Sequence, residues 1–303
     1  MNPMPKRLPR PPKAYKDLEF LNSPDARTVR MLAEFLEPER RFRQTNIKDT
    51  IVFFGSARIR PRRETLDRLK AVHASMENVI RPTKRMLQQF RAAEIQVDLS
   101  RYYEDTVELA RLLTQWSKKL SHSNRFVVCS GGGPGIMEAA NKGAHLAGGK
   151  TIGLNISLPF EQFANPYITP GLNFEFHYFF MRKFWFAYLA KALVVFPGGF
   201  GTLDELMEML TLIQTQKIKK KVGVVIYGSE YWNKVIDFNE FVNQGMIERE
   251  DLNLFKFIDT PQEAFKYLKR FLLETYIRPG DGQEGGKSEG ERLPAGIRPK
   301  PAE

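Results

Sequence analysis

The chain has 303 residues, a formal net charge of +11 and a pI near 9.6. Its 42% of hydrophobic and 27% of charged residues exclude a disordered, fibrous or disulfide-rich protein. A single cysteine, Cys129, excludes an internal disulfide framework and favours a reducing compartment, which we expect to be the cytoplasm. No segment reaches the roughly 20 apolar residues of a membrane span, so we expect no membrane contact. The excess of positive charge favours an anionic partner.

The two ends of the chain have the composition of disordered tails. Residues 1–22 are basic and proline-rich without the apolar core of a secretory signal, and residues 278–303 are rich in glycine, proline and charge. We expect one domain between them, over 23–277, beginning with a helix over 23–38.

Within this domain, short apolar runs alternate with segments of helical periodicity. The expected strands cover 51–55, 126–130, 151–156, 191–196, 222–228 and 255–259. The expected helices cover 103–120, 134–147, 178–190, 202–214, 231–243 and 261–275. Strands that alternate with helices and are near-continuous in apolar residues predict an α/β fold, a doubly wound parallel sheet with helices on both faces. Such sheets bind ligands at the carboxyl ends of their strands.

One segment, at about 58–101, interrupts the alternation. Its apolar spacing predicts two helices, 64–80 and 84–95, separated at Pro82, so we expect an inserted helical hairpin. It carries eleven basic and five acidic residues, a net charge of +6, and the run KIKKK at 217–221 adds four lysines. Such charges are either a solvated surface or a binding surface for an anion.

The first of two glycine-rich turns, CSGGGPGIMEAANKGA, covers 129–144 directly after an expected strand. Gly132, Gly133 and Gly135 would let backbone N–H groups approach a ligand closely, and the helix that follows favours an anion at its N-terminus. We therefore consider these glycines candidate phosphate ligands. A turn that is glycine-rich only for packing is the alternative.

The second turn lies in VVFPGGFGTLDELMEML at 194–210. Gly198, Gly199, Gly201 and Thr202 are its candidate phosphate-binding residues. Thr202 stands where a helix N-cap is expected and Glu205 lies three residues on, the pattern of a capping box in which Glu205 would do no chemistry. Neither turn continues as a P-loop or as GxGxxG with a ribose-binding acid, which disfavours an ATPase or a dinucleotide oxidoreductase.

A cationic pair, Arg182-Lys183, lies in the aromatic segment 174–192, which we expect to be largely helical. Charges there are costly unless they reach solvent, a carboxylate or a phosphate, so the pair either extends to the surface or belongs to a site. The four histidines show no metal-ligand spacing. We expect neither a metal nor a cofactor.

Taken together, these segments resemble the LOG ("lonely guy") family of nucleoside 5′-monophosphate phosphoribohydrolases, once labelled lysine decarboxylases. Residues Pro197–Glu205 fill every fixed position of the family's PGGxGTxxE motif, and Arg182-Lys183 matches its RK pair. The turn GGGPGIMEAAN and FGSAR at 54–58 are similar to the longer bacterial members. The resemblance covers about 48–58 and 102–275. A lysine decarboxylase is disfavoured because no site for a PLP Schiff-base lysine is evident.

The resemblance implies a Rossmann-like sheet, assembled as a homodimer or higher homo-oligomer. It implies hydrolysis of the N-glycosidic bond of a nucleoside 5′-monophosphate, AMP or a cytokinin riboside monophosphate, to free base and ribose 5-phosphate without a cofactor. The implied catalytic residues are Arg182 and Glu205, and Lys183, Thr211 and Ser56 are implied substrate contacts. The chain reads Phe179-Phe180-Met181 where the plant proteins have MHx before RK, which argues against a prediction of cytokinin selectivity.

The chemistry suits these residues. A carboxylate at Glu205 would stabilise the positive charge that develops on the ribose and would position a water. We expect Arg182 to hold the sugar or phosphate and to keep Glu205 ionised, and Tyr178 or Phe179 to line a base pocket. Two alternatives stay open: a nucleotide-binding protein without hydrolysis, and nucleic-acid binding through 58–101, which lacks a known DNA-reading motif.

Overall fold

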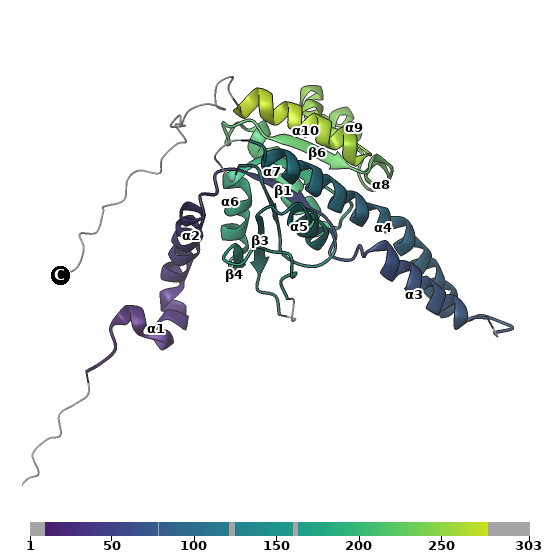
Figure 1. The fold of residues 1–303 in the computed structure, drawn as a ribbon, viewed down its shortest axis with the longest axis horizontal. Coiled ribbons are helices and arrows are strands. Elements are labelled where there is room, and N and C mark those ends of the chain that lie inside the picture. The colour runs from purple at the N-terminus through teal and green to yellow at the C-terminus, as the bar shows by residue number, and fades with distance from the viewer. Residues whose placement is uncertain (1–9, 78, 121–124, 160–162, 278–303) are drawn as a thin grey trace, which may run out of the picture.

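Seven parallel strands form a single sheet through the middle of the molecule (Figure 1). The computed structural model describes residues 10–77, 79–120, 125–159 and 163–277, and within them the strand order is β4-β3-β2-β1-β5-β6-β7. The strands are β1 (Thr50–Phe54), β2 (Val127–Ser130), β3 (Thr151–Ile156), β4 (Asn173–Phe176), β5 (Ala190–Val195), β6 (Gly223–Tyr227) and β7 (Lys256–Ile258). The order reverses between β1 and β5, so the predicted doubly wound parallel sheet is confirmed.

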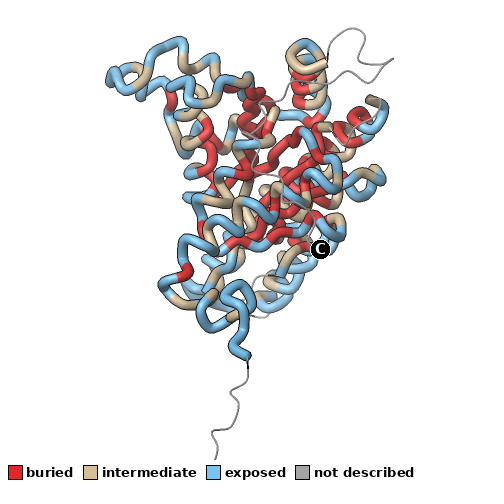
Figure 2. The backbone as a smooth tube through the Cα atoms, turned by 90° about the vertical axis from the view of Figure 1, so that its left-hand side faces the viewer, coloured by how far each residue is buried: buried red, intermediate tan, exposed pale blue. Residues whose placement is uncertain are grey.

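Helices cover both faces of this sheet. One face packs against α2 (Arg27–Gln44), α6 (Phe179–Leu189), α7 (Phe200–Gln214), α8 (Ser229–Val235) and α9 (Phe238–Asn243). The other packs against α4 (Lys84–Ser117), α5 (Ile136–Leu146) and α10 (Pro261–Tyr276). In β1, Val52 and Phe54 belong to the first core and Ile51 and Phe53 to the second, as alternation along a strand requires. Figure 2 shows the buried backbone concentrated in this central layer.

The aromatic segment differs from the expected helix at its start. Asn173–Phe176 is the edge strand β4, with Asn173 and Glu175 exposed and Phe174 and Phe176 buried, and α6 begins only at Phe179. The period-two alternation of four residues is what places this run in the sheet rather than in the helix.

A second difference lies in the expected helix 231–243, which is two helices. α8 ends at Val235, and Asp237 starts α9 by accepting hydrogen bonds from the N–H groups of Asn239 and Glu240. An aspartate in this position caps a new helix, which interrupts the longer apolar pattern.

The helical hairpin consists of α3 (Arg62–Ala74) and the first half of α4, and it projects from the body of the molecule (Figure 1). The expectation of two separate helices over 84–95 and 103–120 was wrong, because α4 is one helix of 34 residues. Residues 96–102 contain neither glycine nor proline to end it. The hairpin is therefore continuous with a core helix whose buried part begins near Tyr102 and Tyr103.

The N-terminal segment contains more helix than expected. Residues 1–9 and 278–303, most of the predicted tails, lie outside the described residues. Within 10–22 the chain forms a 3₁₀ turn at Ala14–Lys16 and the short helix α1 (Leu18–Asn22), without a buried residue. The helix expected over 23–38 is α2, which extends to Gln44. Among the described helices, none has the length and apolar character to cross a bilayer.

Candidate active site

The two glycine-rich turns meet at the carboxyl ends of β1, β2 and β5, where the strand order reverses. Ser56, just beyond β1, joins them through its backbone: its N–H donates to the carbonyl of Pro197 (3.0 Å), and its carbonyl accepts from the N–H of Ile136 (3.1 Å). Its hydroxyl accepts from the N–H of Arg58 at 3.1 Å. This edge is the position at which α/β sheets bind ligands.

The second turn starts α7 earlier than the sequence pattern indicates. The N-cap is Gly199, without a side-chain cap, and Thr202 is a buried residue of the first helical turn. The predicted capping box of Thr202 and Glu205 is therefore wrong. The first helical bond runs from the N–H of Leu203 to the carbonyl of Gly199 at 3.0 Å, so the N–H groups of Phe200, Gly201 and Thr202 have no partner within the helix.

The glycines of this turn differ in whether neighbouring atoms leave room for a side chain. A Cβ on Gly198 would lie 2.1 Å from Thr202 Oγ1, so packing excludes one there. A Cβ on Gly199 or Gly201 would have no atom within 4 Å, and neither residue has a positive φ. The protein's own packing gives no reason for glycine at these two positions. Gly199, Phe200 and Gly201 are exposed, so the start of α7 is accessible from solvent.

Arg182 of α6 and Glu205 of α7 form an ion pair beside this turn. Arg182 Nη2 lies 3.1 Å from Glu205 Oε1, and each side chain is only 11% exposed. The guanidinium lies over the rings of Phe179 and Phe186, at 5.1 and 5.6 Å from their centroids. A Cβ on Gly131 would lie 4.0 Å from Arg182 Nη1, so the pair also borders the first glycine turn.

Burial dominates the electrostatics of the pair. It raises the pKa of Glu205 from 4.5 to about 7, although the Arg182 charge opposes the shift. The expectation that Arg182 keeps Glu205 ionised was therefore wrong, because one contact at 3.1 Å does not compensate for the lost solvation. Burial also lowers the pKa of Arg182, whose Nε has no hydrogen-bond partner among the described residues. Near neutral pH Glu205 can both accept and donate a proton, as general acid–base catalysis requires.

Lys183 turns away from this pair toward two carboxylates of α7. Its Nζ lies 2.7 Å from Asp204 Oδ1 and 3.4 Å from Glu208 Oε2. Burial opposes the charged form, but these carboxylates outweigh it and raise the pKa of Lys183. The contacts join α6 to α7 and occupy the charge that the sequence reasoning assigned to a substrate.

Thr211 lies on a different face of α7 from Glu205. Six residues correspond to a rotation of about 240° around a helix, and Thr211 is exposed, with its hydroxyl donating to the carbonyl of Met207 at 2.7 Å. The structure does not bring Thr211 to the ion pair.

In the first turn, the backbone conformation and the close packing of the protein itself require glycine. Gly132 and Gly135 have φ of +74° and +71°, a region that favours glycine. A Cβ on Gly135 would also lie 2.4 Å from the carbonyl oxygen of Ser56. Gly135 brings the turn against the chain that follows β1 and Gly132 brings it against Asn155 of β3, whether or not a phosphate contacts them.

A buried amide network supports the same turn, and the sequence reasoning missed it. Asn165 Nδ2 donates to the carbonyls of Gly132 (2.9 Å) and Gly133 (3.2 Å) and to Asn141 Oδ1 (2.8 Å). Asn141 in turn accepts a hydrogen bond from Ser130 Oγ at 2.7 Å. Asn165 comes from the β3–β4 connection, and its position in the sequence carried no signal of this contact.

Two further contacts hold the site from outside. Glu34 of α2 accepts hydrogen bonds from the N–H groups of His177 (2.8 Å) and Tyr178 (3.2 Å) and so anchors the N-terminus of α6. The hydroxyl of Tyr231 on α8 donates to the carbonyl of Gly198 at 2.8 Å. Each contact fixes an element that carries part of the site.

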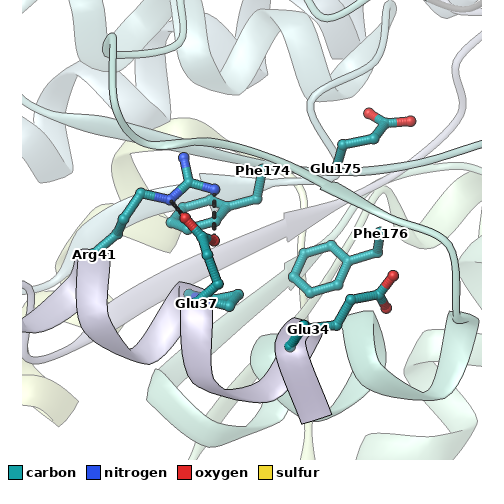
Figure 3. Close-up of a pocket in the computed structure, with 8 residues that line it drawn as sticks. Glu34, Glu37, Arg41, Phe174, Glu175 and Phe176 are labelled. Atoms are coloured by element: carbon teal, nitrogen blue, oxygen red, sulfur yellow. Dashed lines mark hydrogen bonds and ion pairs between the residues drawn. The ribbon is translucent and has the colours of Figure 1, made fainter. Parts of the chain in front are cut away.

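A cavity of about 210 Å³ lies between α2 and β4 (Figure 3). Its lining includes Glu34, Glu37 and Glu175 with Arg41, and no residue of either glycine-rich turn. Three carboxylates disfavour a phosphate there. In the described part of the chain, no group of three or more His, Cys, Asp or Glu side chains is arranged to hold a metal ion.

Comparisons with known proteins point to one family. The family model described as "Possible lysine decarboxylase" matches residues 137–268. A probable cytokinin riboside 5′-monophosphate phosphoribohydrolase of Oryza sativa subsp. japonica is 27% identical over 180 residues, which are 59% of this chain and 76% of that protein. A cytokinin riboside 5′-monophosphate phosphoribohydrolase of Arabidopsis thaliana is 27% identical over 156 residues, 50% of this chain and 71% of that protein. Two other rice relatives of the same kind are matched over 63% and 49% of their length.

Solved structures similar to the chain include a molybdenum cofactor binding protein from Rippkaea orientalis, with 20% identity and a TM-score of 0.40. The match covers 56% of this chain and 88% of that chain. Another is a Moco carrier protein from Chlamydomonas reinhardtii, with 22% identity, coverage of 57% and 89%, and a TM-score of 0.39.

The region matched by the family model contains both members of the ion pair and the whole second glycine-rich turn. The curated relatives named above share one description, and it is the family whose motifs the chain contains. These matches agree with the motifs in showing that the chain is similar to the LOG family.

Proposed function

We propose that this protein hydrolyses the N-glycosidic bond of a nucleoside 5′-monophosphate. Water and the nucleotide give free base and ribose 5-phosphate, and no redox partner is needed. The observation that carries the proposal is the buried Arg182–Glu205 pair at the open N-terminus of α7. It joins an anion site and a carboxylate of raised pKa at the edge where such sheets bind ligands.

The 5′-phosphate would bind at the start of α7. The N–H groups of Phe200, Gly201 and Thr202 point out of the helix, where the helix dipole adds attraction for an anion. The open space in front of Gly199 and Gly201 supports this placement. A phosphate at this point would leave the ribose near Glu205, about one helical turn farther along α7.

Glu205 would act on the glycosidic bond. Its ionised form would stabilise the positive charge that develops on the ribose and would take a proton from the attacking water. Its protonated form would donate a proton to the departing base. With a pKa of about 7, both forms are populated near neutral pH. Arg182 would orient the carboxylate and hold ribose hydroxyls or the phosphate.

The choice of base is a finer part of the proposal. The relatives' names specify cytokinin riboside 5′-monophosphates, which makes isopentenyladenosine monophosphate the first substrate to test. AMP is the second, because apolar pockets discriminate by only about 1–3 kcal/mol per methylene. The aromatic rings nearest Arg182 are those of Phe179 and Phe186, and Phe179, half exposed, is the candidate wall for the base.

The experiment is to incubate the purified protein with each nucleotide and to measure free base and ribose 5-phosphate. Glu205→Gln keeps the size of the side chain and should lose about 10²–10⁴-fold in rate. Glu208→Gln is the matched control: it lies on the same helix, contacts Lys183 rather than Arg182, and should keep its rate. Release of base from neither nucleotide, or equal rates in the two variants, would contradict the proposal.

A nucleotide-binding protein without hydrolysis is the second candidate. The observation in its favour is that Arg182 and Glu205 pair with each other, as the members of a purely structural ion pair would. Calorimetry then decides: heat of AMP binding without base release supports this candidate. Base release that depends on Glu205 rejects it.

We further propose that the protein acts as a homodimer in the cytoplasm. Half-exposed aromatic side chains lie on α6, among them Phe180, and exposed Leu32 and Leu36 lie on α2. Adjacent apolar side chains of this size are commonly covered by a partner. Light scattering coupled to size-exclusion chromatography measures the assembly directly.

A further inference from the structure

The projecting hairpin is the most strongly charged part of the molecule that the proposed reaction does not use. The arm, as we call residues 58–101, comprises α3 and the first half of α4 (Figure 1). Its packing is mostly internal to the two helices. Of the α4 residues from Lys84 to Leu99, only Ala93 is buried.

Exposed cations extend over the whole arm. Near its base lie Arg58, Arg60, Arg62 and Arg63. Along it lie Arg68, Lys70 and Arg91, and at its tip Arg81, Lys84 and Arg85. All are exposed, and none forms an ion pair within 4.0 Å in the described part of the chain, where Arg101 is the arm's one paired cation. Unpaired like charges repel one another, and binding of a polyanion relieves that cost.

The composition of these cations fits phosphate. Arginine predominates over lysine among them, and its planar guanidinium binds phosphate oxygens in a bidentate manner. From Lys84 to Arg101 the arm extends about 27 Å at 1.5 Å per residue. That length corresponds to about eight phosphates of one strand at 3.4 Å per nucleotide.

The distribution of side chains distinguishes between anionic partners. Single-stranded nucleic acid is held largely by stacking of bases on exposed aromatic rings. The arm's one Phe, Tyr or Trp residue is Phe90, which is half-buried and lies 6.2 Å from the His73 ring. A membrane would require an apolar face beside the charges, but the exposed apolar side chains, such as Ile80 at the tip and Ile95 farther along α4, are scattered.

We propose that the arm binds the phosphate backbone of duplex nucleic acid without reading its sequence. The exposed arginines would contact phosphates along the arm. The helices present no residues in the arrangement of a base-reading motif. This inference is independent of the proposed hydrolysis, since it uses no residue of the Arg182–Glu205 site.

The test is fluorescence anisotropy of the full-length chain with a labelled random-sequence duplex, DNA in one series and RNA in the other, over a range of salt concentrations. The arm variant replaces Arg81, Lys84 and Arg85 by Gln. The matched control replaces Lys217, Lys219 and Lys221 by Gln, which removes the same charge from an exposed loop. All six side chains are exposed and unpaired among the described residues, so both variants should keep the melting temperature of the wild type.

We expect salt-dependent duplex binding by the wild type and by the control. The arm variant should bind about tenfold or more weakly, and its slope of log affinity against log salt should be smaller by about 3, one for each lost phosphate contact. If that variant does not fold, a second variant tests the same arm. It replaces Arg63, Lys70 and Arg91 by Gln. Three results would overturn the inference: no duplex binding, equal loss in arm and control variants, or preference for single strands or for phosphatidylserine-containing vesicles over the duplex. Comparison of the DNA and RNA series shows which of the two duplexes the arm binds more tightly.

Discussion

Replacing Glu205 by Gln should lower the rate by about 10²–10⁴-fold and at the same time change how stability depends on pH. The carboxyl is buried beside Arg182, and burial raises its pKa from 4.5 to about 7. Between these two values the folded protein holds the proton more tightly than the unfolded chain does. The free energy of unfolding therefore falls as pH rises through this window, and the stabilisation that the protonated form provides is lost above about pH 7.

The size of the effect follows from the shift. A rise from 4.5 to about 7 at 1.36 kcal/mol per unit gives about 3 kcal/mol. A glutamine cannot titrate, so the variant lacks this component and keeps the dependence that all other groups contribute. At alkaline pH two effects on stability oppose each other. The wild type carries the cost of a buried carboxylate that the variant lacks, and the variant lacks the attraction between Glu205 and Arg182.

The measurement is denaturant unfolding of both proteins at several values from about pH 4 to about pH 8. The difference in unfolding free energy, wild type minus variant, should fall by about 3 kcal/mol across this range, with most of the change between pH 4.5 and about 7. Parallel stability curves for the two proteins would refute the reasoning, because they would mean that Glu205 has an ordinary pKa in the folded state.

Three further predictions concern the rate and the second turn. The pH dependence of kcat/KM should show an ionisation near 7 that is absent from residual activity in Glu205→Gln; a flat profile through this region would contradict the assignment. Gly201→Ala should raise KM about tenfold or more with no loss of melting temperature, since the added methyl group meets open space in the free protein. Gly198→Ala, by contrast, should lower the melting temperature because its methyl group would clash with Thr202. An unchanged KM in Gly201→Ala would mean that the phosphate binds elsewhere. Tyr231→Phe removes the bond to the Gly198 carbonyl and should cost about 1 kcal/mol of stability and lower kcat, and a variant with wild-type kcat would show that this bond does not position the turn.

The sheet could be predicted from the sequence almost completely because its strands are buried on both faces. Runs such as 51–55 and 191–196 are almost entirely apolar, as central parallel strands buried on both faces require. β4 was missed because it is an edge strand, in which exposed and buried residues alternate. It therefore lacks the apolar run of a central strand, and its residues could not be told apart from the aromatic segment that follows. The continuity of α4 was missed because a local pattern of apolar residues does not show where a projecting helix joins the core.

For the candidate site, the sequence offered the residues of the ion pair but not their geometry. Arg182 and Glu205 are 23 positions apart and belong to two separate motifs, the RK pair and PGGxGTxxE, that the sequence analysis singled out. The upward shift of the Glu205 pKa is caused by burial under segments that are distant in the sequence. The residues around Glu205 alone do not reveal that burial. The same holds for Asn165, whose amide reaches the first glycine turn from the β3–β4 connection. The capping box failed because Gly199 begins the helix earlier than Thr202.

The contact between Glu34 and the start of α6 extends the proposed site beyond the segment that the family model matches. α2 precedes the first strand and lies outside the segment that the family model matches. Its carboxylate nevertheless accepts from the N–H groups of His177 and Tyr178, and the Glu34 carbonyl accepts from the indole N–H of Trp185. Arg182 lies between these anchor points on α6. A fragment limited to residues 137–268 would keep Arg182 and Glu205 but lose these contacts to α6, so we expect the proposed activity to require α2 as well.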